Sequence, residues 1–516
     1  MKTIEEKSKV AGFFKFNQGA DLNNNITHSS ALFLIIDSEI NDVETEIHFL
    51  NYWKIKRNVT SLRGRITLRR LDGDFISSED FNVLEVKAFT IKIRPRLKAL
   101  GLCEFTGTVE LEFFSTENLF IPYPAAIVRY VGKNWHTGMH STARYYYEDS
   151  GDSIERISQR QKAVEANITL FSEPDITNSV VLHNGIAQSL SESVTLTVTN
   201  FLGEQLRVIV PNIKMRPLET IVLCVDNHIE YKSFLQGKRG MLEVEYVTQG
   251  VFPRIMFINQ HSNGEFSVEH SNFGYSQNTE LDCIPAGKPD RNLLYSVPVM
   301  PEGFTTEIDI FPTFPITQPP YCIRLTGTDF DGRRLSLEEI NLDAKGSPYL
   351  QYSCTASKQA KVIQIDYINA DKLPNRFHTS INYAFKDSVL PSIILDGPLP
   401  KTASPIRTRW APFFWNRDTV NTRIFLCSRF FEPGAGDELI TINFQLFGEH
   451  ESESLAFEQR ITGRQSIELN VREILSENGW KSSLGWIYIT FSPGSFFTVY
   501  YVSDLAGNSL MCGHAF

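Results

Sequence analysis

Four histidines recur in similar short phrases that are spread along the chain. His140 lies in TGMHSTARYYY, His270 in VEHSNFGYS, His378 in RFHTSINYAF and His514 in MCGHAF. Neutral imidazole is the commonest metal ligand among side chains, and an all-histidine set suits Fe, Zn or Cu. If the four phrases meet in the folded chain, they could hold one transition-metal ion. A closed tetrahedral set would be structural, and a set with an open position would be catalytic.

Each phrase follows a predicted hairpin turn, and the distance is nearly constant. The turns contain Gly73, Gly203, Gly332 and Gly448, and alternating apolar and polar residues precede each of them, as in GRITLRRL. Such alternation indicates a strand, and Asp-Gly or Leu-Gly can supply the positive φ of a tight turn. The phrase histidine follows its glycine by 67, 67, 46 and 66 residues. The spacing predicts four copies of one unit, with the third copy shortened by about twenty residues.

The repeated pattern and the many Phe, Tyr, Val, Ile and Thr residues favour strands. We expect an all-β chain of four tandem immunoglobulin-like, Greek-key β-sandwich modules that arose by internal duplication. A single barrel or a propeller is the alternative, but propeller blades repeat every 40–50 residues or so. The predicted division is an N-terminal arm (1–27), modules at 28–150, 165–276, 291–388 (the shortened copy) and 406–516, and linkers at 151–164, 277–290 and 389–405.

The joint between the first two modules differs from the rest of the chain. Residues 152–166 form the one stretch with helical character. We therefore expect a helical connection there and strands elsewhere.

Alternation along a strand places each phrase histidine on the polar face. His140 shares its face with Thr142 and Arg144, opposite Met139 and Tyr145. Three interpretations stay open. The histidines could close a hydrogen bond at the end of each sandwich, converge on a shared metal ion, or line a surface for a polymeric or protein partner.

Aromatic and basic residues near these phrases are candidates for binding a ligand. The segment RTRWAPFFWNRD (407–418) interleaves arginine with aromatic residues and could form a stacking platform for a sugar or a nucleobase. It equally fits a first strand that contacts the neighbouring module. The candidate ligand-binding residues are Arg144, Trp135, Trp410 and Trp415. His136 and His140 form H-x3-H, a spacing that does not bring both rings to one ion on a strand.

Composition limits which cellular compartment and which kinds of partner are expected. The net charge is −10 and the pI about 5.7, so a protein that coats nucleic acid is not expected. The longest apolar run, ALFLII, is too short to insert into a membrane. Seven scattered cysteines without a CxxC motif favour reduced thiols in a cytoplasmic protein.

No catalytic motif of a known kind is present, neither G-x-S-x-G nor H-E-x-x-H nor a glycine-rich nucleotide loop. The sequence therefore leaves open whether the protein is an enzyme. We expect a binding or assembly protein that associates with another protein or with itself, with carbohydrate as a further candidate ligand. The alternative is a metal-dependent protein or enzyme in which the four phrase histidines hold one transition-metal ion at the module junction.

Overall fold

Eight antiparallel sheets of four or five strands make up most of this computed structural model. This confirms the predicted all-β class. The structure describes residues 27–117, 119, 124–141, 143–147, 160–186, 193–252, 254–273, 283–285, 293–301, 303–311, 321–342, 350–354, 359–368, 372–374, 378–385, 388–395, 399–400, 408–416, 419–428, 438–492, 496–504 and 510–516.

The first two sheets form a pair that shares one apolar core. The outer sheet has the order β1 (Thr27–Ser38), β6 (Glu104–Ser115), β3 (Arg63–Arg70), β4 (Phe75–Asn82). The inner sheet has the order β5 (Ala88–Lys92), β2 (Glu44–Leu50), β7 (Ala126–Val131), β8 (His136–His140). Phe33 and Val109 of the outer sheet pack in the same buried cluster as Ile47 and Phe49 of the inner sheet. The pair is therefore a two-layer β-sandwich.

The second and third sheet pairs repeat this arrangement with one short strand added to each outer sheet. The second pair has outer strands β12 (Gln205–Pro211), β11 (Ser193–Thr199), β14 (Gly240–Gln249), β9 (Arg160–Leu170) and β17 (Asn272–Phe273), and inner strands β13 (Thr220–Cys224), β10 (Ile176–His183), β15 (Met256–His261) and β16 (Phe266–His270). The third has outer strands β22 (Arg334–Leu342), β21 (Tyr321–Thr328), β24 (Val362–Ile368), β19 (Leu293–Pro298) and β28 (Leu399–Pro400), and inner strands β23 (Leu350–Ser353), β20 (Phe304–Phe311), β26 (His378–Phe385) and β27 (Ser392–Leu395).

The fourth pair completes the set. Its outer strands are β29 (Thr408–Phe414), β34 (Leu484–Ser492), β31 (Leu439–Gly448) and β32 (Ser454–Thr462), and its inner strands are β33 (Ile467–Asn470), β30 (Val420–Ser428), β35 (Phe496–Asp504) and β36 (Leu510–His514). In all four pairs the first eight strands visit the sheets in one order: outer, inner, outer, outer, inner, outer, inner, inner. A separate two-stranded sheet joins β18 (Cys283–Pro285) to β25 (Lys372–Pro374).

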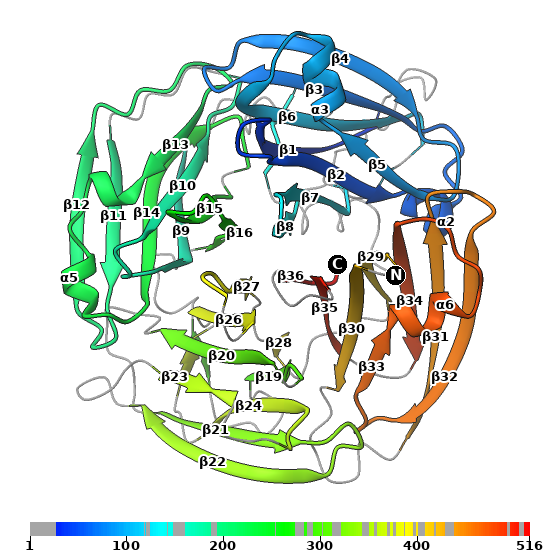
Figure 1. Cartoon of the computed structure of the whole chain (residues 1–516). Coiled ribbons are helices and arrows are strands. Elements are labelled where there is room, and N and C mark those ends of the chain that lie inside the picture. The colour runs from blue at the N-terminus through cyan, green and yellow to red at the C-terminus, as the bar shows by residue number, and fades with distance from the viewer. Residues whose placement is uncertain are drawn as a thin grey trace.

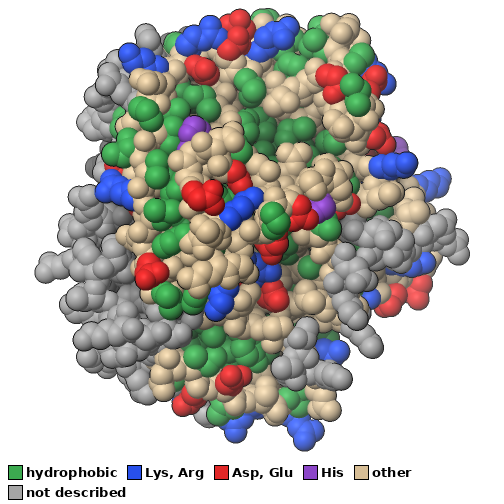
Figure 2. Space-filling view, turned by 60° about the vertical axis from the view of Figure 1, so that its left-hand side comes forward, with side chains coloured by type: hydrophobic (Ala, Val, Ile, Leu, Met, Phe, Trp, Pro, Cys, Tyr) green, Lys and Arg blue, Asp and Glu red, His purple; other side chains and the backbone are tan. Residues whose placement is uncertain are grey.

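The four sheet pairs stand in a ring around a central axis, and the chain runs once around it (Figure 1). The innermost strands contact one another in a closed cycle of β8 with β16, β16 with β27, β27 with β36, and β36 with β8. Four strands far apart in the sequence therefore meet at the axis. On the face shown in Figure 2, basic and acidic side chains are interspersed.

Each junction around the ring has its own side-chain contact. Arg216 donates to the Asp72 carbonyl between the first and second pairs (2.7 Å), and Arg239 pairs with Asp309 between the second and third (3.0 Å). The Ser296 hydroxyl donates to the Ser428 carbonyl between the third and fourth (2.7 Å). The Thr90 hydroxyl donates to Glu449 between the first and fourth (3.0 Å), so the ring is closed by direct bonds.

The predicted turns are confirmed in three copies. Gly73, Gly203 and Gly332 have φ of +88°, +76° and +78°, in the region that favours glycine. Gly448 differs, because it is the last residue of β31 and the turn follows it.

The helical connection expected over 152–166 is wrong where the structure describes it. Residues from Arg160 onward form β9, which pairs along its length with β14. Strand pairing thus overrides the local helical pattern. The described helices are short: α2 (Tyr52–Arg57), α3 (Arg94–Ala99), η3 (Val225–Asn227), α5 (Lys232–Leu235) and α6 (Val471–Ser476). None of these is long and apolar enough to span a bilayer.

The expected segment boundaries fall mainly on residues outside the described part of the chain. This holds for nearly all of the arm at 1–27 and for most of the linkers at 151–164 and 277–290. Strand β27 lies at 392–395, inside the range expected to be the linker 389–405.

Gly73→Ala tests the junction between the first two sheet pairs. An added Cβ would lie 2.5 Å from the Pro217 carbonyl oxygen, so the neighbouring backbone would have to shift. The matched control is Gly101→Ala, which has a similar φ of +72° but open space around the Cβ. We expect the control to lose about 1–2 kcal/mol of unfolding free energy and Gly73→Ala to lose roughly 1 kcal/mol more. Equal losses in chemical denaturation would contradict this packing.

Candidate metal centre at the ring axis

Three of the four phrase histidines lie together at the axis. His140, His270 and His514 are the last residues of β8, β16 and β36, the eighth strands of the first, second and fourth sheet pairs. One ring nitrogen from each lies within 4.8 Å of the others. Histidines more than a hundred residues apart in the sequence thus lie together at one site.

The third sheet pair has a different residue at this position. Its eighth strand is β27, which ends at Leu395, and Leu395 is the register partner of Ser380 on β26. His378 lies one strand further out, on β26, opposite Phe311, and its side chain lies outside the described part. Leu395 follows Gly332 by 63 residues (332 to 395), close to the 66 or 67 of the other copies. Aligning His378 with the other three was therefore wrong, and this part of the third copy is not shortened by twenty residues.

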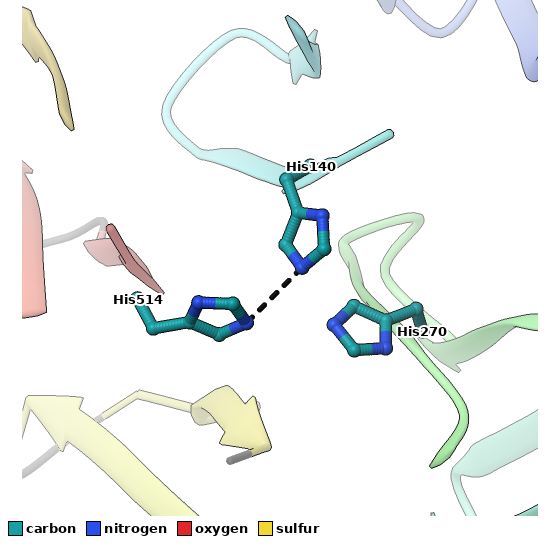
Figure 3. Close-up of side chains that lie close together, drawn as sticks. All are labelled: His140, His270 and His514. Atoms are coloured by element: carbon teal, nitrogen blue, oxygen red, sulfur yellow. Dashed lines mark hydrogen bonds between the residues drawn. The ribbon is translucent and has the colours of Figure 1, made fainter. Parts of the chain in front are cut away.

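The rings are arranged with their Nε2 atoms toward a common point (Figure 3). The Nε2 atoms of His140 and His514 are 3.1 Å apart. The ring centre of His140 is 4.4 Å from that of His270 and 4.7 Å from that of His514, and the rings of each pair are steeply inclined. Edges rather than faces therefore meet at the axis.

The other ring nitrogen of each histidine contacts the backbone. Nδ1 lies near the carbonyl oxygen of the following residue, at 3.0 Å in His140, 2.7 Å in His270 and 3.3 Å in His514. The N–H of that following residue donates to the neighbouring strand in all three pairs. A carbonyl can only accept, so Nδ1 carries the proton and Nε2 keeps its lone pair.

This arrangement agrees with one part of the first interpretation for three of the four histidines, because His140, His270 and His514 each close a hydrogen bond at a strand end. It does not explain why the Nε2 atoms face one another. A hydrogen bond between His140 and His514 would require one ring to move its proton from Nδ1 to Nε2 and lose the carbonyl contact. A cation between the two lone pairs would satisfy both rings without that loss.

Burial and nearby charge keep the imidazoles of His140 and His270 neutral. Burial is the largest cause that lowers the pKa of His140 and His270 well below the usual value. The neighbouring imidazoles and the Arg254 guanidinium lower the pKa of both further. Neutral imidazole is the form that binds metal ions.

The sequence pattern does not single out two ionisable side chains at the site, Glu269 and Arg254. Oε1 of Glu269 lies 3.4 Å from Nε2 of His270 and accepts from the His270 backbone N–H. Burial raises the pKa of Glu269 to about 8. Arg254 donates to the Ser271 carbonyl at 2.6 Å and pairs with Glu165 at 3.3 Å. An acid in the apolar strand FSVEH was the available signal for Glu269.

The aromatic candidates do not form an open platform. Trp410 is buried, and its ring stacks on Tyr488 with ring centres 3.9 Å apart. Residues 408–414 form β29, the first strand of the fourth pair. This matches the alternative interpretation of the segment, in which it is a first strand and not a platform. Trp415 is half-buried against the same core, and Trp135 packs edge-on against Phe266.

The two remaining candidates are buried among contacts of their own. Arg144 is buried, with its guanidinium over the Tyr146 ring. His136 lies at the other end of β8 and is also buried, with Nε2 3.2 Å from the Val502 carbonyl oxygen. As expected, H-x3-H does not bring both rings to one place.

Comparison with known proteins assigns no family. No family model and no curated protein matches the chain. Among solved structures, the FN1–FN3 domains of chicken CNTN1 align over 64% of this chain and 98% of their own, at 9% identity and a TM-score of 0.10. The function must therefore be inferred from the site itself.

His136→Gln tests the burial of a neutral histidine between the first and fourth pairs. Burial lowers its pKa to about 3, whereas the unfolded chain should titrate near 6.5. Below that pH only the unfolded state takes up the proton, so the unfolding free energy falls by up to about 1.4 kcal/mol per pH unit. We expect chemical denaturation to show that, from pH 7.5 to pH 5, His136→Gln loses less unfolding free energy than the parent does. Parallel pH dependence would contradict a neutral, buried His136.

Proposed function

We propose that this protein binds one transition-metal ion at the ring axis, with Nε2 of His140, His270 and His514 as ligands. The observation that carries the proposal is the convergence of three imidazoles whose Nδ1 atoms already donate to backbone carbonyls. Such a contact fixes the ring orientation and the tautomer of a metal-binding histidine.

The spacing of the nitrogens suits an ion of this size. Zinc binds histidine nitrogen at about 2.0–2.1 Å, which puts neighbouring tetrahedral ligands about 3.4 Å apart. His140 and His514 are already at 3.1 Å. Movement of His270 on the order of 1 Å would bring the third nitrogen into reach.

The donor set favours particular metals. Imidazole nitrogen suits Zn, Cu and Fe, whereas Mg and Ca prefer oxygen ligands. Because the three ligands come from the first, second and fourth sheet pairs, a bound ion would also link the beginning and the end of the ring.

We infer in addition that the four sheet pairs are immunoglobulin-like, Greek-key modules related by duplication. The support is the identical order in which the chain visits the two layers of each pair. The central pairings also agree with that class, since the second strand pairs with the fifth and the third with the sixth. The module boundaries given above belong to this proposal.

A binding or assembly role is the second candidate, and exposed apolar residues on edge strands favour it. Strands β4, β12 and β22 are edges of the outer sheets. They carry Phe75, Ile209 and Leu337, which are 62%, 61% and 47% exposed. Unpaired strand edges with apolar side chains are suited to pairing with another chain. A second copy of this protein is the partner we propose, in a reducing, cytoplasmic compartment that suits the six described free cysteines.

The metal proposal predicts a specific pattern among histidine variants. Untagged protein purified without chelators should contain about one equivalent of transition metal by elemental analysis. His140→Ala, His270→Ala and His514→Ala should each lower metal affinity by roughly tenfold or more. His378→Ala, on the neighbouring strand, is the matched control and should keep its metal. A parent that takes up no Zn, Cu or Fe, even on reconstitution, would refute the proposal.

The assembly proposal predicts that charge on the edge strands prevents self-association. We expect the parent to form oligomers at high concentration in light scattering, and Phe75→Lys with Ile209→Lys to return it to a monomer. Leu100→Lys is the control, because Leu100 is 44% exposed but follows a helix. A parent that stays strictly monomeric would count against this role.

A further inference from the structure

We propose that the axial ion keeps one coordination position open on the side of the third sheet pair, and that this position binds a small anion. This inference rests on the proposed metal site. It goes further by naming where an outside ligand binds and what charge it carries.

The strand register defines the open position. Four eighth strands contact one another around the axis. Three of them end in histidine, and the fourth, β27, ends in Leu395. Leucine has no atom that can bind a metal. Among the described residues, the ligands therefore come from three of the four sides of the ring. Three protein ligands with a fourth place left open is the arrangement found in catalytic zinc sites.

Charge around the site favours an anion in that place. The three imidazoles are neutral ligands, so a divalent ion would keep its full charge. Arg254 adds positive charge on the Nδ1 side of His270, because its guanidinium donates to the same Ser271 carbonyl that accepts from His270 Nδ1. Glu165 already pairs with Arg254. A small anion would offset the charge of the ion, as buried charges require.

Glu269 is the internal competitor for the open position. Its Oε1 lies 3.4 Å from Nε2 of His270. Its carboxyl oxygens, however, do not join the group of ring nitrogens that lie within 4.8 Å of one another, so Glu269 lies near His270 but outside the three-histidine cluster. The register counterparts of Glu269 in the first and third pairs are Met139 and Ile394, which are buried in the apolar cores. We therefore assign the open position to a ligand from solution.

Solvent can reach the site, but only in part. His140 and His514 are half-buried and His270 is buried. The Phe516 ring lies 5.2 Å from that of His140 and covers one side. This partial exposure suits a ligand of a few atoms.

Azide binding to Co²⁺-loaded protein tests the inference, since azide is a small anion and Co²⁺ reports its ligands in the visible spectrum. We expect a saturable change in the Co²⁺ absorption of the parent. Leu395→His should supply a fourth imidazole and abolish the azide response while Co²⁺ stays bound. Leu395→Ala, which supplies no ligand, should keep the response.

The outcomes separate this inference from the metal proposal. A parent that binds no Co²⁺ refutes both. A parent that binds one equivalent of Co²⁺ but does not respond to azide refutes the open position alone. If azide acts only on Glu269→Gln and not on the parent, the carboxylate fills the position and the inference is wrong. An azide response that persists unchanged in Leu395→His would also overturn it.

Discussion

The closed cycle of contacts among β8, β16, β27 and β36 is the constraint on which the rest of the structure depends. Each sheet pair has strands enough for its own core, but only the ring brings the eighth strands together. The first and fourth pairs even share one apolar cluster, in which Trp410 and Phe413 pack with residues such as Tyr52 and Trp53. The first and the fourth sheet pairs are thereby fixed beside one another (Figure 1).

Ring closure gives the histidines a chemistry that none of them has alone. At the end of a strand, the residue after each histidine continues the ladder through its N–H and leaves its carbonyl free to accept from Nδ1. The same hydrogen bond, from Nδ1 to the carbonyl of the following residue, therefore orients all three rings in the same way. Burial then keeps His140 and His270 neutral, and the ring symmetry directs the remaining lone pairs to one axis.

Much of this fold could be predicted from local patterns. Period-2 alternation and turn glycines identify the strands, and constant spacing identifies His140, His270 and His514 as equivalent. The same reasoning selected His378 because its phrase, HTS, resembles the phrase of His140, HST, although it belongs to the preceding strand. Alternation shows which face a residue occupies, but not which strand of a sheet is its neighbour.

The rest depends on packing between modules, which no local pattern contains. Trp410 looked suited to a platform because its neighbours are aromatic and basic, yet Tyr488 and the core cover it. The convergence of the histidines likewise follows from how four sandwiches pack around an axis. Glu269 and Arg254 become recognisable as parts of the site only once that packing is known.

The most direct test of the metal centre is an anomalous difference map from crystals grown with zinc and measured on both sides of the zinc absorption edge. A single strong peak within about 2.0–2.1 Å of the Nε2 atoms of His140, His270 and His514 is the predicted result. A map without a peak between these three rings, from crystals grown with zinc in excess over protein, would contradict the account.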